Sequence, residues 1–194
     1  MEGLFPPDSR LSEAMLCDAL GVSRNTLREA FRLLGHDRLV AHELHRGVFV
    51  RVPSTSDIED LYRVRSIVEC GAVRAARNPT QAQIREVREP VVAGQRAAAR
   101  SDWSAVGTAD LRFHQALAGL ANSDRINELM RSVLAELRLV FHVMASPREF
   151  HEPYLARNVE IVDLIDAGET QAAARVLAGY LEDAEAQLTA ATRS

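Results

Sequence analysis

The pattern of apolar positions in residues 1–36 predicts two short helices separated by a tight turn. Ser12 is a suitable N-cap for the first helix, and Gly21 suits its end, where a positive φ is needed. Ser23 is a suitable N-cap for the second helix. Apolar side chains then recur at helical spacing and are expected to be buried: Leu27, Ala30, Phe31 and Leu34.

Two runs of β-prone residues, 39–41 and 48–52, follow the second helix. Between them, His45, Arg46 and Gly47 form a predicted hairpin tip, where glycine supplies the backbone freedom that a tight turn needs. Residues 53–56 break the pattern and are predicted to be a linker. A helix, a turn, a second helix and a hairpin in this order are typical of a winged helix-turn-helix, here in residues 1–52.

From residue 57 to residue 194 the pattern is helical throughout. Ser56 and Glu59 have the spacing of a capping box at the start of the first of these helices, and Thr80 with Gln83 offers a second box. Further helices are expected over 80–99, 102–121, 123–145, 149–167 and 169–191. The sequence therefore predicts a mainly α fold, with an N-terminal winged helix-turn-helix followed by an all-α antiparallel bundle of about six helices.

Polar and basic side chains gather at the start of the second predicted helix, the element that enters the major groove in a helix-turn-helix. Arg24 and Arg28 are four residues apart and project from one face, and each can donate two hydrogen bonds to guanine O6 and N7. On an isolated helix two such arginines would more often form a solvated face, but the ordered set of elements favours DNA binding. The predicted DNA-binding residues are Arg10, Ser23, Arg24, Asn25, Thr26, Arg28, Arg46 and Gly47.

The formal net charge of −4 is compatible with DNA binding once it is divided along the chain. Residues 1–52 hold seven arginines and seven acidic residues, so the deficit falls on the remainder, which holds sixteen arginines and twenty acidic residues. Within residues 23–51, six arginines stand against three acidic residues. An acidic bundle does not cancel this local positive charge, because salt screens charges beyond about 8 Å at physiological ionic strength.

Three motifs in the N-terminal part resemble the DNA-binding domain of GntR-family regulators: Leu-Ser-Glu at 11–13, Leu-Gly-Val-Ser-Arg with Leu-Arg-Glu-Ala over 20–30, and Arg-Gly-Val-Phe-Val at 46–50. The stretches 61–69, 110–114 and 161–169 resemble the C-terminal domain of the FadR subfamily. The resemblance covers nearly the whole chain. It implies a homodimeric transcription regulator, expected to be a repressor, that binds a palindromic operator and responds to a small carboxylate effector.

The chain departs from this family at its start, where a further helix usually precedes the turn at residues 5–8. Only Met1–Leu4 stand there. We therefore expect the first helix of the winged domain to be missing, and the apolar faces of the two remaining helices to be exposed.

The resemblance also implies an effector pocket in the bundle, often beside a metal held by one Asp and several His. Asp110 and His114 match two of these positions, and their i, i+4 spacing places them on one helix face. The other two positions fall on Asn158 and Tyr180, which lie at similar distances from the Ala-Gly-Glu turn on antiparallel helices. Arg65 is expected to reach the same pocket, where Asp110, Glu69 or an effector carboxylate could pair with it.

An amide and a phenol are poor ligands for a soft divalent ion, so we expect a hydrogen-bonded polar cluster rather than a tight metal site. A weakly bound Zn or Ni at Asp110 and His114 is the alternative, with His142 or His151 as substitute ligands. A ligand-free dimerisation module is a second alternative. A metal-dependent enzyme using Asp110 and His114 is a remote third, because the chain shows no nucleophile motif or phosphate loop.

Two distant cysteines, Cys17 and Cys70, make a disulfide framework or zinc finger unexpected. No apolar run approaches the roughly 20 residues of a membrane span, and no signal peptide opens the chain. The sequence therefore predicts a soluble, cytoplasmic protein that is not an enzyme.

Overall fold

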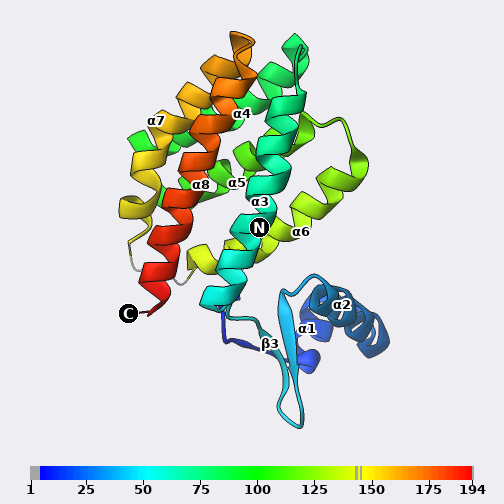
Figure 1. Ribbon diagram of the computed structural model, residues 1–194. Coiled ribbons are helices and arrows are strands. Elements are labelled where there is room, and N and C mark those ends of the chain that lie inside the picture. The colour runs from blue at the N-terminus through cyan, green and yellow to red at the C-terminus, as the bar shows by residue number, and fades with distance from the viewer. Residues whose placement is uncertain (1–4, 143, 145, 194) are drawn as a thin grey trace. The chain divides into compact units, whose positions relative to one another are not determined.

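Figure 1 shows the computed structural model of the chain, which describes residues 5–142, 144 and 146–193. The chain divides into two compact units, Met1–Pro53 with Ala135–Val143, and Ser54–Leu134 with Met144–Ser194. Among the described residues the strands all lie in the first unit, and helices make up nearly all of the second. The predicted fold class is confirmed.

Residues 5–53 form two helices and a three-stranded sheet: β1 Arg10–Leu11, α1 Glu13–Leu20, α2 Arg24–His36, β2 Val40–Glu43 and β3 Gly47–Val50. The strand order is β1-β3-β2, and β3 is antiparallel to both neighbours. The sequence pattern predicts β2 and β3 but misses β1, because two residues are too few to show an alternation.

The caps of α1 and α2 are those that the sequence predicts. The Ser12 hydroxyl accepts a hydrogen bond from the Met15 amide at 3.4 Å, and the Ser23 hydroxyl accepts one from the Thr26 amide at 3.1 Å. Gly21 ends α1 with φ 64°. The two serine side chains accept hydrogen bonds from backbone amides that have no partner within the helix, and Gly21 adopts the positive φ that ends α1. The turn between the two helices is therefore tightly defined.

A small apolar core joins α2 to the sheet. Its buried members are Leu11, Leu27, Phe31, Val40, Val48 and Val50, with Leu34 half-buried against them. Ala30, which the spacing predicted to be buried, is exposed. At about 100° per residue, Ala30 lies at the edge of the stripe formed by Leu27, Phe31 and Leu34, which explains the error.

Several large apolar side chains on α1 and α2 are exposed: Met15 by 73%, Leu20 by 62% and Leu33 by 60%. Residues 1–4, where the usual further helix was expected to be missing, lie outside the described residues.

The residues described after Pro53 form six helices, the number predicted: α3 Thr55–Ala75, α4 Gln81–Ala99, α5 Trp103–Gly119, α6 Asp124–His142, α7 Pro147–Asp166 and α8 Thr170–Arg193. The last turns of α6 group with the first unit. α3 packs on α5 and α8, and α7 packs on α4, α5 and α8. α5 packs on α3, α4 and α7, so it is the helix in the middle of the bundle (Figure 1).

The start of α3 differs from the prediction. Its N-cap is Ser54, which forms a capping box with Asp57, so the predicted box of Ser56 and Glu59 is wrong. Both pairs have the same spacing, but α3 begins two residues earlier than the second pair requires. The predicted capping box of Thr80 with Gln83 at the start of α4 is confirmed.

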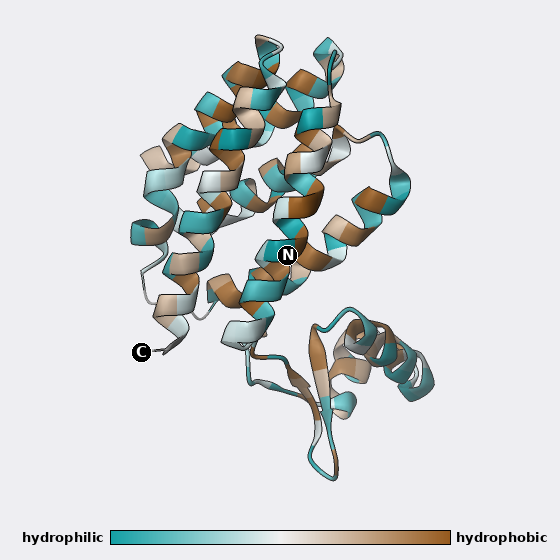
Figure 2. Cartoon of the chain, viewed as in Figure 1, coloured by the Kyte–Doolittle hydropathy of each residue, from teal (hydrophilic) through white to brown (hydrophobic). Residues whose placement is uncertain are grey.

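In Figure 2, apolar and hydrophilic residues alternate along each helix of the bundle, as expected for helices with one buried and one exposed face. Ile58, Phe113, Leu137, Ile161 and Leu177 are among the fully buried side chains of this core. In the described part of the chain, no helix combines the length and apolarity needed to cross a membrane.

Candidate functional site

The residues predicted to bind DNA are all exposed on the N-terminal unit: Arg10, Ser23, Arg24, Asn25, Thr26, Arg28, Arg46 and Gly47. Those on α2 occupy its N-cap and four of its first five positions. Backbone amides at a helix N-terminus and the helix dipole both favour anions such as phosphate. The structure thus gathers one group of donors at the start of α2 and another at the β2–β3 hairpin.

Arg24 and Arg28 are the first and fifth residues of α2, so one helical turn separates them on the same face. Within the described residues, the Arg24 side chain forms no hydrogen bond or ion pair. Arg28 is held by Glu13 at the start of α1, through Nε at 3.1 Å from Oε1 and Nη2 at 3.1 Å from Oε2. Hydrogen bonding to Arg28 lowers the pKa of Glu13, which favours its ionised form.

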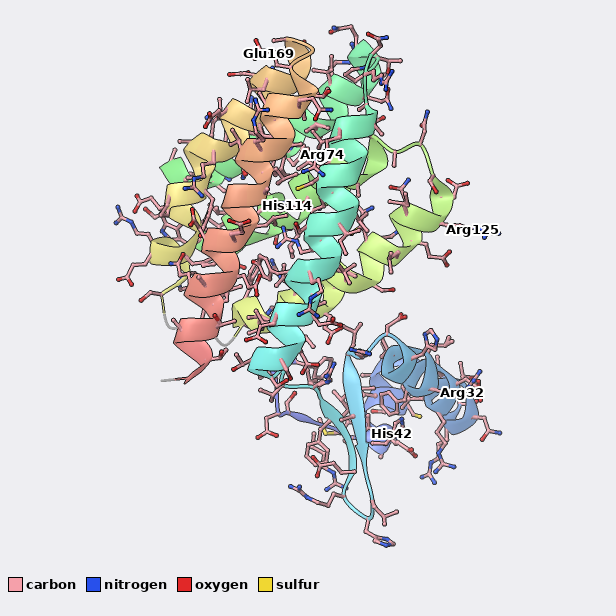
Figure 3. The ribbon with its side chains drawn as sticks, viewed as in Figure 1. Arg32, His42, Arg74, His114, Arg125 and Glu169 are labelled. Atoms are coloured by element: carbon pink, nitrogen blue, oxygen red, sulfur yellow. The ribbon has the colours of Figure 1, made fainter. Side chains whose placement is uncertain are left out.

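Sequence reasoning missed Glu13. The two residues are fifteen positions apart, and only the packing of α1 on α2 brings them together. By contrast, Arg32 pairs with Glu29 on its own helix, at the i, i+3 spacing that a helix pattern makes visible. Figure 3 labels Arg32 on this exposed part of α2.

Two further arginines lie at the sheet: Arg46 in the β2–β3 turn, and Arg10 on β1, which pairs with β3. Gly47 has φ 110°, and a side chain added there would place its Cβ 3.4 Å from Nε of Arg10. The guanidinium of Arg46 lies 5.1 Å from the centre of the Phe49 ring and also pairs with Glu43. The positive φ is therefore what favours glycine at position 47, whereas the distance to Arg10 would be an ordinary van der Waals contact for a Cβ.

The second unit contains a cluster of buried polar side chains, which we call the α5 cluster. It comprises Arg65 and Glu69 on α3, Asp110 and His114 on α5, Asn158 on α7 and Tyr180 on α8. All six are at most 7% exposed. The structure therefore brings together the five residues predicted for the effector pocket and adds Glu69, one of the partners considered for Arg65. His114 is labelled within the bundle in Figure 3.

One side of the α5 cluster is a chain of charged hydrogen bonds. Arg65 Nε donates to Glu69 Oε1 at 2.8 Å, and His114 Nδ1 donates to Glu69 Oε2 at 2.6 Å. The Arg65 guanidinium also lies 4.7 Å from the centre of the Tyr62 ring. Arg65 pairs with Glu69 at i, i+4 spacing, so this partner was visible in the sequence, whereas the contact with His114 depends on how α3 packs on α5.

On the other side, Asp110 is held by neutral donors. Its Oδ1 accepts hydrogen bonds from the Tyr180 hydroxyl at 2.9 Å and from Asn158 Nδ2 at 3.2 Å. His114 Nε2 lies 3.8 Å from the same oxygen, too far for a hydrogen bond. Three helices thus converge on one carboxylate oxygen.

The ionisation of these groups follows from their neighbours. Burial raises the pKa of Glu69, but Arg65 and His114 outweigh it and hold this pKa below its ordinary value. Burial also raises the pKa of Asp110, and His114, His151 and Arg65 reverse the effect. Burial raises the pKa of Tyr180 well above its ordinary value, so its hydroxyl keeps its proton and donates to Asp110.

Three buried atoms of the α5 cluster have no hydrogen-bond partner among the described residues: Arg65 Nη2, His114 Nε2 and Asn158 Oδ1. A cavity of about 10 Å³ adjoins Asp110 and Asn158, with His151, Val91 and Leu155 also in its wall. This volume is about that of one water probe, far below the roughly 300 Å³ of a small-molecule pocket.

The donor set does not fit a tightly bound divalent metal. Among the described residues, no three His, Cys, Asp or Glu side chains are grouped so that they could hold one. At the two remaining family positions, Asn158 and Tyr180 use their N–H and O–H groups to donate to Asp110. In relatives that bind a metal, these two positions and the Asp carboxylate would be ligands of the same ion. Here their side chains instead donate hydrogen bonds to the Asp110 carboxylate.

Comparison with known proteins gives the family. The family of bacterial regulatory proteins called gntR matches residues 1–50, and the FCD domain matches residues 60–183. The Nta operon transcriptional regulator of Aminobacter aminovorans is 30% identical over 90% of this chain and 82% of its own length. A protein of Paenarthrobacter nicotinovorans, named as the probable D-xylose utilization operon transcriptional repressor, is 25% identical over 93% of this chain and 79% of its own length.

A crystal structure from Rhodococcus sp. RHA1, of a protein proposed to be a GntR transcriptional regulator, is 54% identical to this chain. It matches with a TM-score of 0.92 and covers 98% of this chain and 91% of its own. These relatives and both matching families are transcription regulators rather than enzymes. With its N-terminal winged helix-turn-helix and its FadR-type FCD domain, the chain belongs to the GntR family of DNA-binding transcription regulators.

Proposed function

We propose that this regulator is a cytoplasmic repressor that binds a palindromic operator as a homodimer, and that a small organic acid in its FCD domain changes the operator affinity. The observation that carries the effector part is the α5 cluster, whose ionisable groups are buried and which holds three polar atoms without a partner in the part of the chain that the structure describes. Burying such groups without partners costs free energy, so a binding role accounts for them better than a structural role does.

The DNA-binding part rests on the exposed donors of α2 and the hairpin. Arg24 and Arg28 would lie against base edges in the major groove, while Ser23, Asn25 and Thr26 donate to phosphates beside the helix N-terminus. Arg10, Arg46 and Gly47 would approach an adjacent groove. Two such units related by a two-fold axis would require a palindromic site.

This part is tested with the full chain and a library of random DNA duplexes. Repeated selection should enrich one palindromic sequence, and sedimentation should show two chains on each duplex. Selection of a sequence without two-fold symmetry, or binding of a single chain, would contradict the dimeric arrangement.

Arg65 is the group in the α5 cluster that suits a carboxylate, because its Nη2 has no partner among the described residues. An organic acid would need more room than the cavity of about 10 Å³ provides. Binding must therefore displace side chains of the bundle, and a ligand that favours one packing over another can shift the DNA-binding equilibrium. A differential affinity of about 1.4 kcal/mol would change the operator-competent ratio tenfold.

We further propose that effector binding needs no metal, with weak Zn or Ni binding at Asp110 and His114 as the alternative. Thermal unfolding of the full chain distinguishes metal-free effector binding from metal-dependent binding. The melting temperature is measured with a panel of hydroxy acids and dicarboxylates, each with and without Zn or Ni. A stabilising acid whose effect does not change with metal supports the proposal. The control is the variant Asn158→His with Tyr180→His, which restores the family's histidines and should gain stability with metal.

A ligand-free FCD domain that only dimerises is the second candidate. It is favoured by the small cavity and by the two donors from the chain itself that hold Asp110. If no acid in the panel raises the melting temperature or alters operator binding, this candidate replaces the effector-responsive one. The name of one relative refers to D-xylose utilization, so acids derived from sugars are the first to include in the panel.

A further inference from the structure

The ion pair between Glu13 and Arg28 differs from the other exposed pairs of the N-terminal unit. It joins two helices and engages two nitrogens of the guanidinium, with Nε also 3.3 Å from Glu13 Oε2. The pair of Arg32 with Glu29 lies within one helix and uses Nε alone. Arg28 is therefore held in one orientation, whereas a single contact leaves a side chain free to swing.

Stability does not account for this arrangement. The side chains of Arg28 and Glu13 are 63% and 35% exposed, and exposed ion pairs contribute about 0–1 kcal/mol. Their backbones, however, are fixed: Ser12 caps α1 immediately before Glu13, and Ser23 caps α2 five residues before Arg28. Glu13 can thus act as a rigid support for the Arg28 guanidinium.

The pair leaves part of the guanidinium available. Of its five N–H donors, Nε uses one and Nη2 uses one, so three remain. At the same time the carboxylate cancels the charge of Arg28, so the pair adds little to the general attraction for phosphates. What remains is a set of donors with a fixed direction, which suits recognition of a base edge.

We propose that Glu13 is a positioning residue for DNA recognition, and that it holds Arg28 so that the remaining donors meet one base of the operator. This role rests on the proposed function, in which α2 enters the major groove. Glu13 then raises the discrimination between operator and other DNA while it lowers the affinity for DNA in general.

Positioning and simple electrostatics predict opposite results when the carboxylate is removed. Glu13→Gln deletes a negative charge from the DNA-facing surface, so electrostatics alone predicts tighter binding to every duplex. Loss of a positioned contact predicts weaker binding to the operator and unchanged or tighter binding to other DNA. Glu13→Asp keeps the charge but shortens the reach, so only positioning predicts an effect.

The experiment measures the affinity of the full chain by fluorescence anisotropy for two duplexes, the sequence that the wild-type protein selects and a scrambled one of equal composition. Both Glu13 variants should reduce the ratio of the two affinities about tenfold, within the range of one good bidentate base contact. The matched control Glu29→Gln removes a charge from α2 and should leave the ratio unchanged. Combining Glu13→Gln with Arg28→Ala should be no worse than Arg28→Ala alone.

If both Glu13 variants keep the wild-type ratio of affinities for the selected and scrambled duplexes, the role of Glu13 is refuted and the proposed function is unaffected. An additive loss in the double variant overturns it as well, because Glu13 would then act independently of Arg28. If the wild-type chain selects no sequence at all, the proposed function itself fails, and this role of Glu13 fails with it.

Discussion

The buried ion pair of the α5 cluster gives the largest effect on stability that the structure predicts. Glu69→Gln keeps the shape of the side chain but leaves the Arg65 guanidinium, 1% exposed, without its carboxylate. His114 Nδ1 loses the same charged acceptor. The buried Arg65 charge then has no hydrogen-bonded carboxylate, and among the acidic groups of the α5 cluster only Asp110 still interacts with it.

Removing one partner of a buried pair typically costs about 3–5 kcal/mol. For a chain of this size each kcal/mol lowers the melting temperature by about 2–4 °C, so the expected decrease is roughly 6–20 °C. The control Glu86→Gln changes an exposed residue of α4 in the same way and should alter the free energy of unfolding by less than about 0.5 kcal/mol.

Urea denaturation followed by circular dichroism measures these free energies. The double variant Arg65→Met with Glu69→Gln removes both charges and should recover much of the lost stability, because replacing a buried pair by apolar groups is often neutral. The reasoning is refuted if Glu69→Gln costs less than about 1 kcal/mol, or if the double variant is no more stable than Glu69→Gln alone.

Three further predictions concern the pH dependence of stability and the substitution of Tyr180 and of Gly47. The lowered pKa values of Glu69 and Asp110 mean that their ionised forms favour the folded state above the ordinary values of 4.5 and 3.8, and that this stabilisation is lost as the pH falls through the lowered values. The urea midpoint should therefore fall below about pH 4.5, and less so in Glu69→Gln; an equal fall in both proteins would refute the assignment. Tyr180→Phe removes the hydroxyl that donates to Asp110 and should cost about 1–3 kcal/mol in the same assay, whereas no change would show that this hydrogen bond is unimportant. Gly47→Ala forces a side chain into φ 110° beside Arg10, so amide hydrogen exchange in β2 and β3 should become faster, and unaltered protection would contradict the strain.

Local sequence signals predicted most of the fold. Ser12, Ser23 and Thr80 cap helices as expected, and Gly21 ends α1, because these features depend on residues within one turn of each other. The start of α3 was misplaced because the sequence offers two capping boxes in succession, and local spacing does not choose between them. Strand β1 was missed because its pairing partner lies nearly forty residues away.

The candidate site residues divide in the same way. The i, i+4 pairs, such as Asp110 with His114 and Arg65 with Glu69, can be recognised along one helix. The contact of Glu69 with His114 joins α3 to α5 and depends on packing, so the sequence left the partner of Arg65 open among three candidates. Glu13 gave no signal, because its pairing with Arg28 depends on how α1 packs on α2.

The most direct measurement of the central claim compares wild-type protein with Arg24→Ala on the selected and scrambled duplexes over a range of salt concentrations. Arg24 begins α2, and its exposed side chain forms no hydrogen bond or ion pair within the described residues. If α2 recognises bases through Arg24, the variant should lose about 1–3 kcal/mol of discrimination between the two duplexes, a fall of roughly 5- to 150-fold in the affinity ratio. A variant that still prefers the selected duplex as strongly as the wild-type protein would contradict the assignment of α2 as the recognition helix.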